Sequence, residues 1–307
     1  MAILVTGAAG LVGRAAVAAL LRQGVEHVRA VVREPAQVGD LRRLGAKVAL
    51  LDATDPDGLA AAMDGVFTAC SLTGSLWSGP GEDPYAAVVA PAQVFLTAAE
   101  SAGVRRVVVC SPAAVAGPAA RDNPHLAAKA EVERLVAASG LEHAILRCTH
   151  VLGPGGRLLA LLGGASPPGP VPAATDRPVP ALGAPGRDRV LVPGDGRQRV
   201  APVWVGDVAD AIAIADDAVE LAATTWSLAG PTQLTFDDLV DAVHGGRVAK
   251  RHSEPPGQPE PALSEAQVGV LAADSVADPA LPAPPGLVPT PLAEALARSA
   301  GRVAGPP

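Results

Sequence analysis

The chain has 307 residues, of which 49% are hydrophobic and 18% are charged, and its net charge is −7. This length provides enough material for one large domain or two, so disorder of the whole chain is excluded. An acidic chain lacks a basic face for the phosphates of a duplex, and 2% aromatic residues offer few surfaces on which bases could stack. Nucleic acid is therefore not expected as a partner.

The first residues do not have the pattern of a signal peptide or a membrane anchor. MAILVTGAAG has no basic stretch before its apolar run, which soon reaches a glycine. Three cysteines, Cys70, Cys110 and Cys148, lie 40 and 38 residues apart, which fits neither a disulfide framework nor a short metal-ligand motif. We therefore expect a cytoplasmic protein with reduced thiols, no metal and no membrane segment.

Residues 1–150 alternate short apolar runs with helical patterns, which is typical of parallel βαβ units. We expect strands at Ala2–Thr6, His27–Val32, Lys47–Leu51, Val66–Ser71, Arg106–Cys110 and His143–Arg147. We expect helices at Leu11–Gln23, Pro35–Leu44, Asp57–Met63, Ala86–Ser101 and His125–Ser139, each followed by a glycine that can cap its end: Gly24, Gly45, Gly65, Gly103 and Gly140. The order predicts an α/β fold with a doubly wound parallel Rossmann sheet.

The second half of the chain is richer in loop-forming residues. Residues 163–202 and 254–291 are dense in Pro and Gly, so neither segment can be mostly regular structure. Other patterns predict a strand at Val203–Val205, a helix at Asp207–Ala215 capped by its first residue, a strand at Trp226–Ala229 and a helix at Thr235–Val243. We expect a Rossmann domain in residues 1–150, with a returning strand and helix near 203–215, and a smaller, loop-rich C-terminal lobe in 151–202 and 216–307.

A glycine-rich loop follows the first expected strand. It reads Thr6-Gly7-Ala8-Ala9-Gly10-Leu11-Val12-Gly13 and leads directly into the first expected helix. Gly7 permits a tight turn, Gly10 lets backbone amides approach a pyrophosphate, and Gly13 allows close packing of the helix on the strand. The helix N-terminus attracts the anion, so the loop predicts a dinucleotide site that includes Thr6, Leu11 and Val12. The alternative is a plain glycine turn.

Two residues at strand ends bear on which dinucleotide binds. The second strand ends in Arg33, whose guanidinium can pair with a 2′-phosphate, so we expect NADPH, with NADH less favoured. Arg14 at the start of the helix can assist. Asp52, after the third strand, is placed to accept from the adenine amino group, although it could equally cap the next turn. Arg33 could instead be a solvated surface charge.

Several stretches, in order, resemble the short-chain dehydrogenase/reductase superfamily, in particular its atypical NmrA-like members. Besides the glycine loop they are VRAVVREP with LRRLGAKVALLDATDP, AGVRRVVVCSPAAVAG, HLAAKAEVERLVAASGLEHAILRCTHVLGPGG, and VWVGDVADAIAIA with WSLAGPTQLTF. The resemblance covers most of the chain and implies NAD(P) binding. It is less specific for reaction, because the family includes quinone and isoflavone-type reductases, epimerase relatives and nucleotide-sensing regulators.

The catalytic motif of that superfamily is incomplete in this chain. Typical members use a Ser, a Tyr and a Lys four residues after the Tyr, the Lys lowering the pKa of the Tyr that exchanges a proton with the substrate. Lys129 fits the Lys position, but His125 stands at the Tyr position, and Pro112 occupies the usual Ser position, with Ser111 one residue earlier. The chain has one tyrosine, Tyr85, and Val89 stands four residues after it, so no Tyr-x-x-x-Lys exists.

His125 has two interpretations. Positions 125 and 129 share a helix face, so an imidazole could replace the tyrosine as proton donor beside Lys129. Alternatively, His125 merely caps or lines the start of the helix after Asn123-Pro124. Lys129 is expected to contact the cofactor, since the chain has only three lysines and this one stands at the family spacing. The alternative for Lys129 is a solvated helix face.

The substrate side is less defined by the sequence. Trp77 follows the fourth strand, where substrates of such folds approach, so it is expected to wall the pocket. The three cysteines end neighbouring strands and could converge, with His150 nearby, although buried cysteines mostly act as small hydrophobes. The sequence predicts an NADPH-dependent reductase of a small apolar carbonyl or conjugated substrate. The alternative is a nucleotide-binding sensor or scaffold of the NmrA-like type that has lost its chemistry.

Overall fold

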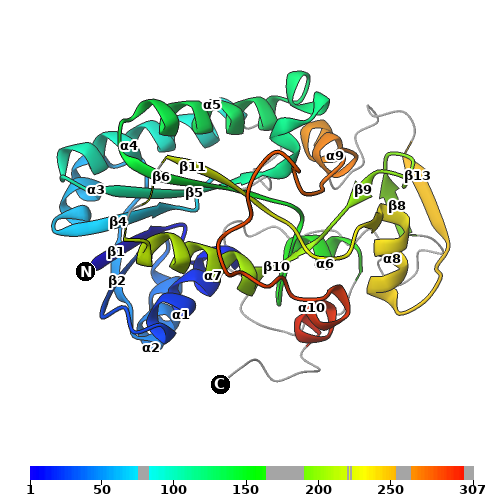
Figure 1. Cartoon of the computed structure of the whole chain (residues 1–307), viewed down its shortest axis with the longest axis horizontal. Helices are drawn as coiled ribbons and strands as arrows, with labels where there is room; N and C mark the ends of the chain where they lie inside the picture. The colour runs from blue at the N-terminus through cyan, green and yellow to red at the C-terminus, as the bar shows by residue number, and fades with distance from the viewer. Residues whose placement is uncertain (75–82, 164–189, 220, 222, 254–263, 301–307) are drawn as a thin grey trace.

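The computed structural model describes residues 1–74, 83–163, 190–219, 221, 223–253 and 264–300. Its central feature is a parallel sheet of seven strands in the order β11-β6-β5-β4-β1-β2-β3 (Figure 1). The strands are β1 (Ala2–Thr6), β2 (His27–Val32), β3 (Lys47–Leu50), β4 (Val66–Ser71), β5 (Arg106–Pro112), β6 (Glu142–Cys148) and β11 (Thr224–Leu228). The predicted doubly wound Rossmann sheet is confirmed.

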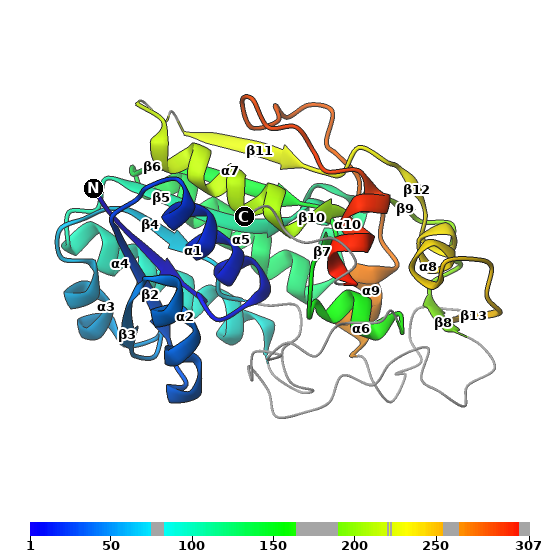
Figure 2. The ribbon, with the colours of Figure 1, turned by 90° about the horizontal axis from the view of Figure 1, so that it is seen from below.

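Helices cover both faces of this sheet, as Figures 1 and 2 show. One face carries α1 (Leu11–Arg22), α2 (Val38–Leu44) and α7 (Val205–Asp217), and the other carries α3 (Pro56–Met63), α4 (Ala90–Ser101) and α5 (Pro124–Ala138). Each face has its own cluster of buried Ala, Val, Leu and Ile side chains. Because both faces are covered, the central strands β1, β4 and β5 consist mostly of apolar residues.

The expected elements of residues 1–150 agree with the observed ones to within a few residues. All five glycines predicted to end helices have positive φ, between 66° at Gly65 and 106° at Gly45, which glycine adopts without a Cβ clash. The helix expected at Pro35–Leu44 begins as the 3₁₀ turn η1 (Pro35–Gln37), and the helix expected at Ala86–Ser101 begins as the π-helical turn η2 (Tyr85–Val89). Two further 3₁₀ turns, η3 (Ala113–Ala116) and η4 (Pro118–Arg121), join β5 to α5.

Three expectations for the second half differ from the structure. The strand expected at Trp226–Ala229 is β11, which joins the edge of the central sheet beside β6 instead of staying within the lobe. The returning strand near residue 203 is β10 (Val203–Trp204), which pairs with β7 (Val151–Leu152) and not with the central sheet. Asp207 does not cap α7: the helix starts at Val205, and Asp207 instead accepts hydrogen bonds from the Thr290 amide and hydroxyl, at 2.8 and 2.7 Å.

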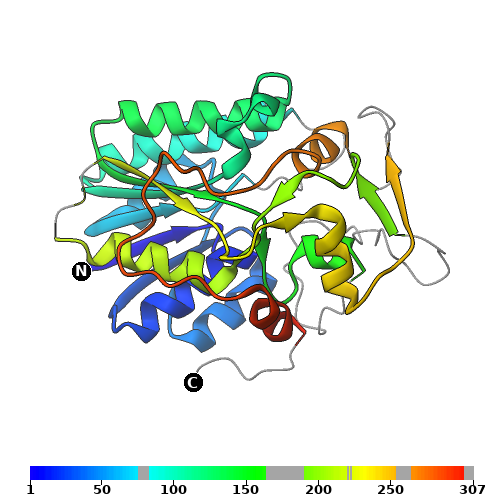
Figure 3. The same ribbon diagram turned by 45° about the vertical axis from the view of Figure 1, so that its right-hand side comes forward.

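The smaller lobe is built from short elements beyond the carboxyl edge of the sheet (Figure 3). They are α6 (Arg157–Leu161), β8 (Val190–Pro193), β9 (Arg199–Val200), β12 (Leu234–Thr235), α8 (Phe236–His244), β13 (Lys250–Ser253), α9 (Glu265–Leu271) and α10 (Leu292–Ser299). Their apolar residues form a core separate from the two at the sheet. None of the helices in the described part of the chain is long and apolar enough to span a membrane.

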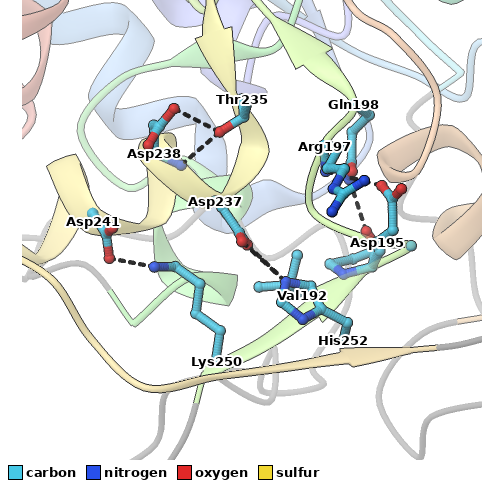
Figure 4. A network of polar contacts seen from close by, with 12 residues as sticks. Val192, Asp195, Arg197, Gln198, Thr235, Asp237, Asp238, Asp241, Lys250 and His252 are labelled. Carbon is cyan, nitrogen blue, oxygen red and sulfur yellow. Dashed lines mark hydrogen bonds and ion pairs between the residues drawn. The ribbon is translucent and has the colours of Figure 1, made fainter.

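Polar contacts tie β13 to α8 in the smaller lobe (Figure 4). His252 Nε2 lies 2.9 Å from Asp237 Oδ1, and Lys250 Nζ pairs with Asp241. The Thr235 hydroxyl caps α8 by accepting from the Asp238 amide at 3.1 Å. These contacts fix β13 and α8 relative to each other and lie away from the carboxyl edge of the sheet.

Candidate functional site

The glycine loop after β1 has the geometry that its sequence predicts. Gly7 has φ +65°, and a Cβ there would lie 2.6 Å from the Leu72 carbonyl oxygen. A Cβ on Gly13 would lie 2.2 Å from the Gly7 carbonyl oxygen, so only glycine permits α1 to pack against the loop. Gly10 is the N-cap of α1 and offers no side-chain acceptor to the first helical amides. The amides at this helix start are therefore available to an anion.

A cavity of about 380 Å³ opens at the carboxyl ends of β1, β4, β5 and β6. Gly7, Gly10, Leu11, Val12 and Gly13 form one end of it. Its other walls come from the β4 and β5 ends, α5, the β6–α6 connection and α9. They include Thr73, Gly74, Ser111, Pro112, His125, Lys129, His150, Leu158, Val270 and Leu271. Most of this wall is apolar, and no Asp or Glu is among the described residues that line it.

Lys129 brings a buried ammonium into this cavity. It lies in the second turn of α5, is 8% exposed, and donates from Nζ to the Thr73 carbonyl oxygen at 3.2 Å. Burial lowers the pKa of Lys129 to about 8, against the opposing effects of Cys110, Glu133 and Cys148. The amine is thus mostly protonated at neutral pH and can release a proton just above it.

His125 lies one helical turn before Lys129 and lines the same cavity. Its side chain is 3% exposed, and its ring makes no hydrogen bond with a described residue. Asn123, not His125, caps α5, because Asn123 Oδ1 accepts from the amides of His125 and Leu126 at 3.0 and 3.1 Å. Burial, and then the Lys129 charge, lower the pKa of His125 to about 4. The imidazole is therefore neutral at neutral pH.

Ser111 and His150 are two further polar residues of the cavity wall. Ser111 is 4% exposed, and its hydroxyl has no hydrogen-bond partner in the described part of the chain. His150 Nε2 is likewise buried without such a partner, and its ring packs edge-on against Phe236 at 6.1 Å. Burial lowers the pKa of His150 to about 4. A buried polar atom without a partner is costly, so both residues are suited to binding a ligand.

Two of the three cysteines, which end neighbouring strands, lie in the cavity wall. They are Cys110 and Cys148, and the neighbouring Cys110 side chain, together with burial, raises the pKa of Cys148 well above its ordinary value. Cys70 is fully buried and lies within electrostatic reach of Cys110. All three are free thiols, and no group of metal-binding side chains occurs among the described residues.

Three of the predicted cofactor residues lie outside this cavity. Thr6 is buried at the end of β1, where its hydroxyl donates to the Cys70 carbonyl oxygen at 3.2 Å. Asp52 caps a turn by accepting from the Thr54 amide and hydroxyl at 2.9 and 2.8 Å, which is the alternative noted from the sequence.

Arg33 is exposed after β2, with Nε 3.3 Å from Glu34 Oε1 and within electrostatic reach of Asp52. Arg14 pairs with Asp40 at 2.9 Å.

The structure adds wall residues that the sequence analysis missed. Val270 and Leu271 come from α9, more than a hundred residues after Lys129 in the chain, and only the tertiary fold places them there. His150, noted from the sequence only as a neighbour of the cysteines, also lines the cavity, where it follows β6 at the edge at which ligands bind. Trp77, predicted to wall the pocket, lies outside the described residues, so its role stays a prediction.

The residues present fit a dinucleotide. Glycines without Cβ atoms and free amides at the start of α1 suit a pyrophosphate, and the Lys129 ammonium at the other side suits ribose hydroxyls. The profile of a protein family described as NAD(P)H-binding matches residues 7–167. This match confirms the resemblance to atypical short-chain dehydrogenases/reductases. A comparison with curated proteins finds no match.

Solved structures of similar fold include reductases and an epimerase. Citrobacter sp. triphenylmethane reductase complexed with NADP(H) is 18% identical, with 97% of this chain and 100% of that chain covered and a TM-score of 0.71. NADPH-dependent quinone oxidoreductase from Escherichia coli, complexed with NADPH, is 19% identical, with coverage of 96% and 98% and a TM-score of 0.67. UDP-glucuronic acid 4-epimerase from Bacillus cereus, with UDP-glucuronic acid and NAD, is 18% identical, with 98% of each chain covered and a TM-score of 0.68. At these identities the similarity shows the fold alone.

Proposed function

Because the chain belongs to the NAD(P)H-binding family, we propose that it is an NADPH-dependent reductase of small, apolar carbonyl or conjugated substrates. One observation carries the proposal: the buried Lys129 ammonium shares a largely apolar cavity with the dinucleotide loop. When bound, a reduced nicotinamide supplies a hydride. Two reductases of similar fold are named for triphenylmethane dyes and for a quinone, which are conjugated molecules, and this supports the conjugated part of the substrate class.

The preference for NADPH rests on Arg33. This guanidinium stands exposed after β2, at the position that faces a ribose 2′ substituent in Rossmann folds, and among the described residues its one carboxylate contact is with Glu34. A bidentate pair with a 2′-phosphate is stronger than any contact with a neutral hydroxyl. We propose that Arg33 makes this pair, and that Asp52 and Thr6 support the adenosine side through the loops that they brace.

The proton that follows the hydride is proposed to come from Lys129. Because His125 and not a tyrosine stands four residues before Lys129, the reduced oxygen needs another donor. His125 was the sequence-based candidate as an imidazolium, but with a pKa of about 4 it is neutral at neutral pH. Lys129, with a pKa of about 8, is protonated there and can give up its proton. His125 then acts as a neutral residue of the cavity wall beside Lys129, and Ser111 is a proposed hydrogen-bond donor to the substrate oxygen.

A sensor or scaffold without chemistry is the second candidate. The observation in its favour is Pro112 at the usual serine position, together with the absence of a tyrosine motif. The proton-transfer groups are needed for turnover and not for binding, so such a protein would still bind the nucleotide.

Binding and turnover distinguish the two candidates. We expect isothermal titration to show NADPH binding, and a panel of quinones, enones and aromatic aldehydes to include one that consumes NADPH. The Lys129→Met variant should lose this consumption. If NADPH binds but no member of the panel is reduced, the sensor is favoured. If NADPH does not bind, both candidates fail.

A further inference from the structure

The three cysteines differ in their access to the cavity. Cys70 is fully buried and is not part of the cavity wall, and Cys148 is 8% exposed. Cys110 lines the cavity and is the most exposed of the three. A reagent that enters the cavity therefore meets the sulfur of Cys110 with the least hindrance.

Access and a neighbouring charge favour Cys110 as the nucleophile of the cluster. Cys148 is buried, and its thiol donates to the Leu146 carbonyl oxygen at 3.5 Å. Cys110 is less buried, and the Lys129 ammonium in the same cavity attracts negative charge on its sulfur. Thiolates, and not thiols, attack electrophiles, and such electropositive, partly exposed surroundings are where reactive cysteines occur.

We propose that Cys110 is a covalent modification site, at which its sulfur adds to α,β-unsaturated carbonyl compounds that enter the cavity. The sulfur forms a C–S bond to the β-carbon, and the C=C π bond breaks. The proton lost by the thiol ends on the α-carbon, and Lys129 is the cavity group placed to carry it. Nothing is oxidised or reduced in this addition, so no further reactant is needed.

The wall around Cys110 suits this class of electrophile. Leu158, Val270 and Leu271 offer an apolar surface for a carbon skeleton. Ser111 is the next residue along β5, and its unpartnered hydroxyl can donate to a carbonyl oxygen. The choice of a conjugated carbonyl rests on the proposed function, but the addition itself requires neither NADPH nor turnover.

The test is labelling of the cofactor-free full chain with N-ethylmaleimide and with cyclohex-2-enone, followed by intact-mass and peptide mass spectrometry. We expect one rapid adduct per chain, on Cys110, formed at least as fast as adducts on the urea-unfolded chain. Cys110→Ser should abolish it, whereas Cys70→Ser and Cys148→Ser should retain it. Lys129→Met should slow it roughly threefold or more, since the positive charge that attracts the attacking sulfur is removed.

Other outcomes overturn the proposal. A first adduct on Cys70 or Cys148, or labelling of Cys110 more slowly than in the unfolded chain, shows that Cys110 is not activated. An unchanged rate of adduct formation in Lys129→Met would show that the ammonium does not promote the addition at Cys110. Thermal unfolding of each variant checks that it is folded. The labelling uses the cofactor-free chain, so its result does not depend on NADPH binding. A failure of NADPH binding would refute the proposed function but not the proposed modification of Cys110.

Discussion

Arg147 on β6 holds Glu133 on α5 through two nitrogens, with Nη2 to Oε2 at 2.7 Å and Nε to Oε2 at 3.1 Å. Glu133 lies one helical turn beyond Lys129, so this ion pair fixes the helix that carries the ammonium against the strand that ends in Cys148. Glu133 is 8% exposed, which limits screening by water. It also raises the pKa of Lys129 against the larger effect of burial.

We predict that Glu133→Gln destabilises the protein and alters Lys129. Loss of charged hydrogen bonds to a partly buried Arg147 should cost about 2 kcal/mol of unfolding free energy, measured by urea denaturation. The pKa of Lys129 should also fall further, because one group that raised it is gone. Glu131→Gln is the control, since Glu131 pairs with Arg134 at the surface. Equal urea midpoints for Glu133→Gln and wild type would contradict the prediction.

The pH dependence of turnover should follow Lys129. If its ammonium supplies the proton, the rate should fall as pH rises through about 8, where Lys129 loses its proton. His125, at a pKa of about 4, should contribute no change near neutral pH. Steady-state rates across this range in wild type and His125→Phe are the measurement. A rate that falls with a midpoint near 6.5 and is lost in His125→Phe would return the role to the imidazole.

Stability should depend on His125 at acid pH. Its folded pKa of about 4 lies below the ordinary 6.5, so the unfolded chain binds the extra proton. The contribution of His125 to the free energy of unfolding is therefore fully present above pH 6.5 and is lost as pH falls towards 4. In His125→Phe, the slope of unfolding free energy against pH should be smaller by up to about 1.4 kcal/mol per pH unit near pH 5.

Arg33 should determine the choice of nucleotide. Wild type should bind NADPH more tightly than NADH, and Arg33→Ala should weaken NADPH binding roughly tenfold to hundredfold while leaving NADH unchanged. Isothermal titration with both nucleotides measures this. Arg43→Ala is the matched control, because Arg43 is an exposed arginine that pairs with Asp40 on α2. Equal affinity of wild type for the two nucleotides would refute the assignment.

Gly13 should tolerate no side chain. In Gly13→Ala, the Cβ would overlap the Gly7 carbonyl oxygen, so the loop or α1 must move at a cost of about 1–3 kcal/mol. NADPH binding should be lost or strongly weakened. Gly39→Ala on α2 is the control, because a Cβ there would have an Arg43 side-chain nitrogen as its nearest neighbour, at 3.6 Å. This variant should have an unfolding free energy equal to or higher than that of wild type. Wild-type NADPH affinity in Gly13→Ala would show that the loop does not hold the pyrophosphate.

The sequence alone determined the central fold and the cofactor end of the site. Apolar runs, helical periods and glycine stops are local properties, and they located β1 to β6 and the helices between them to within a few residues. The Gly7–Gly13 loop was equally readable, because its chemistry depends on contacts between residues that are near each other in the chain. The spacing from position 125 to Lys129 is fixed by one helix, so their shared cavity was predictable too.

The far wall of the cavity, the place of β11 and the protonation states depend on contacts between segments that are far apart in the chain. Residues Val270 and Leu271 reach the cavity through packing of the small lobe, and β11 joins β6 across a long connection, which no local pattern encodes. The protonation states also depend on burial, because the exclusion of water lowers the pKa of His125 to about 4 and the pKa of Lys129 to about 8. Sequence spacing can bring an imidazole and an ammonium to one helix face. The depth at which the surrounding fold buries them determines which one holds a proton at neutral pH.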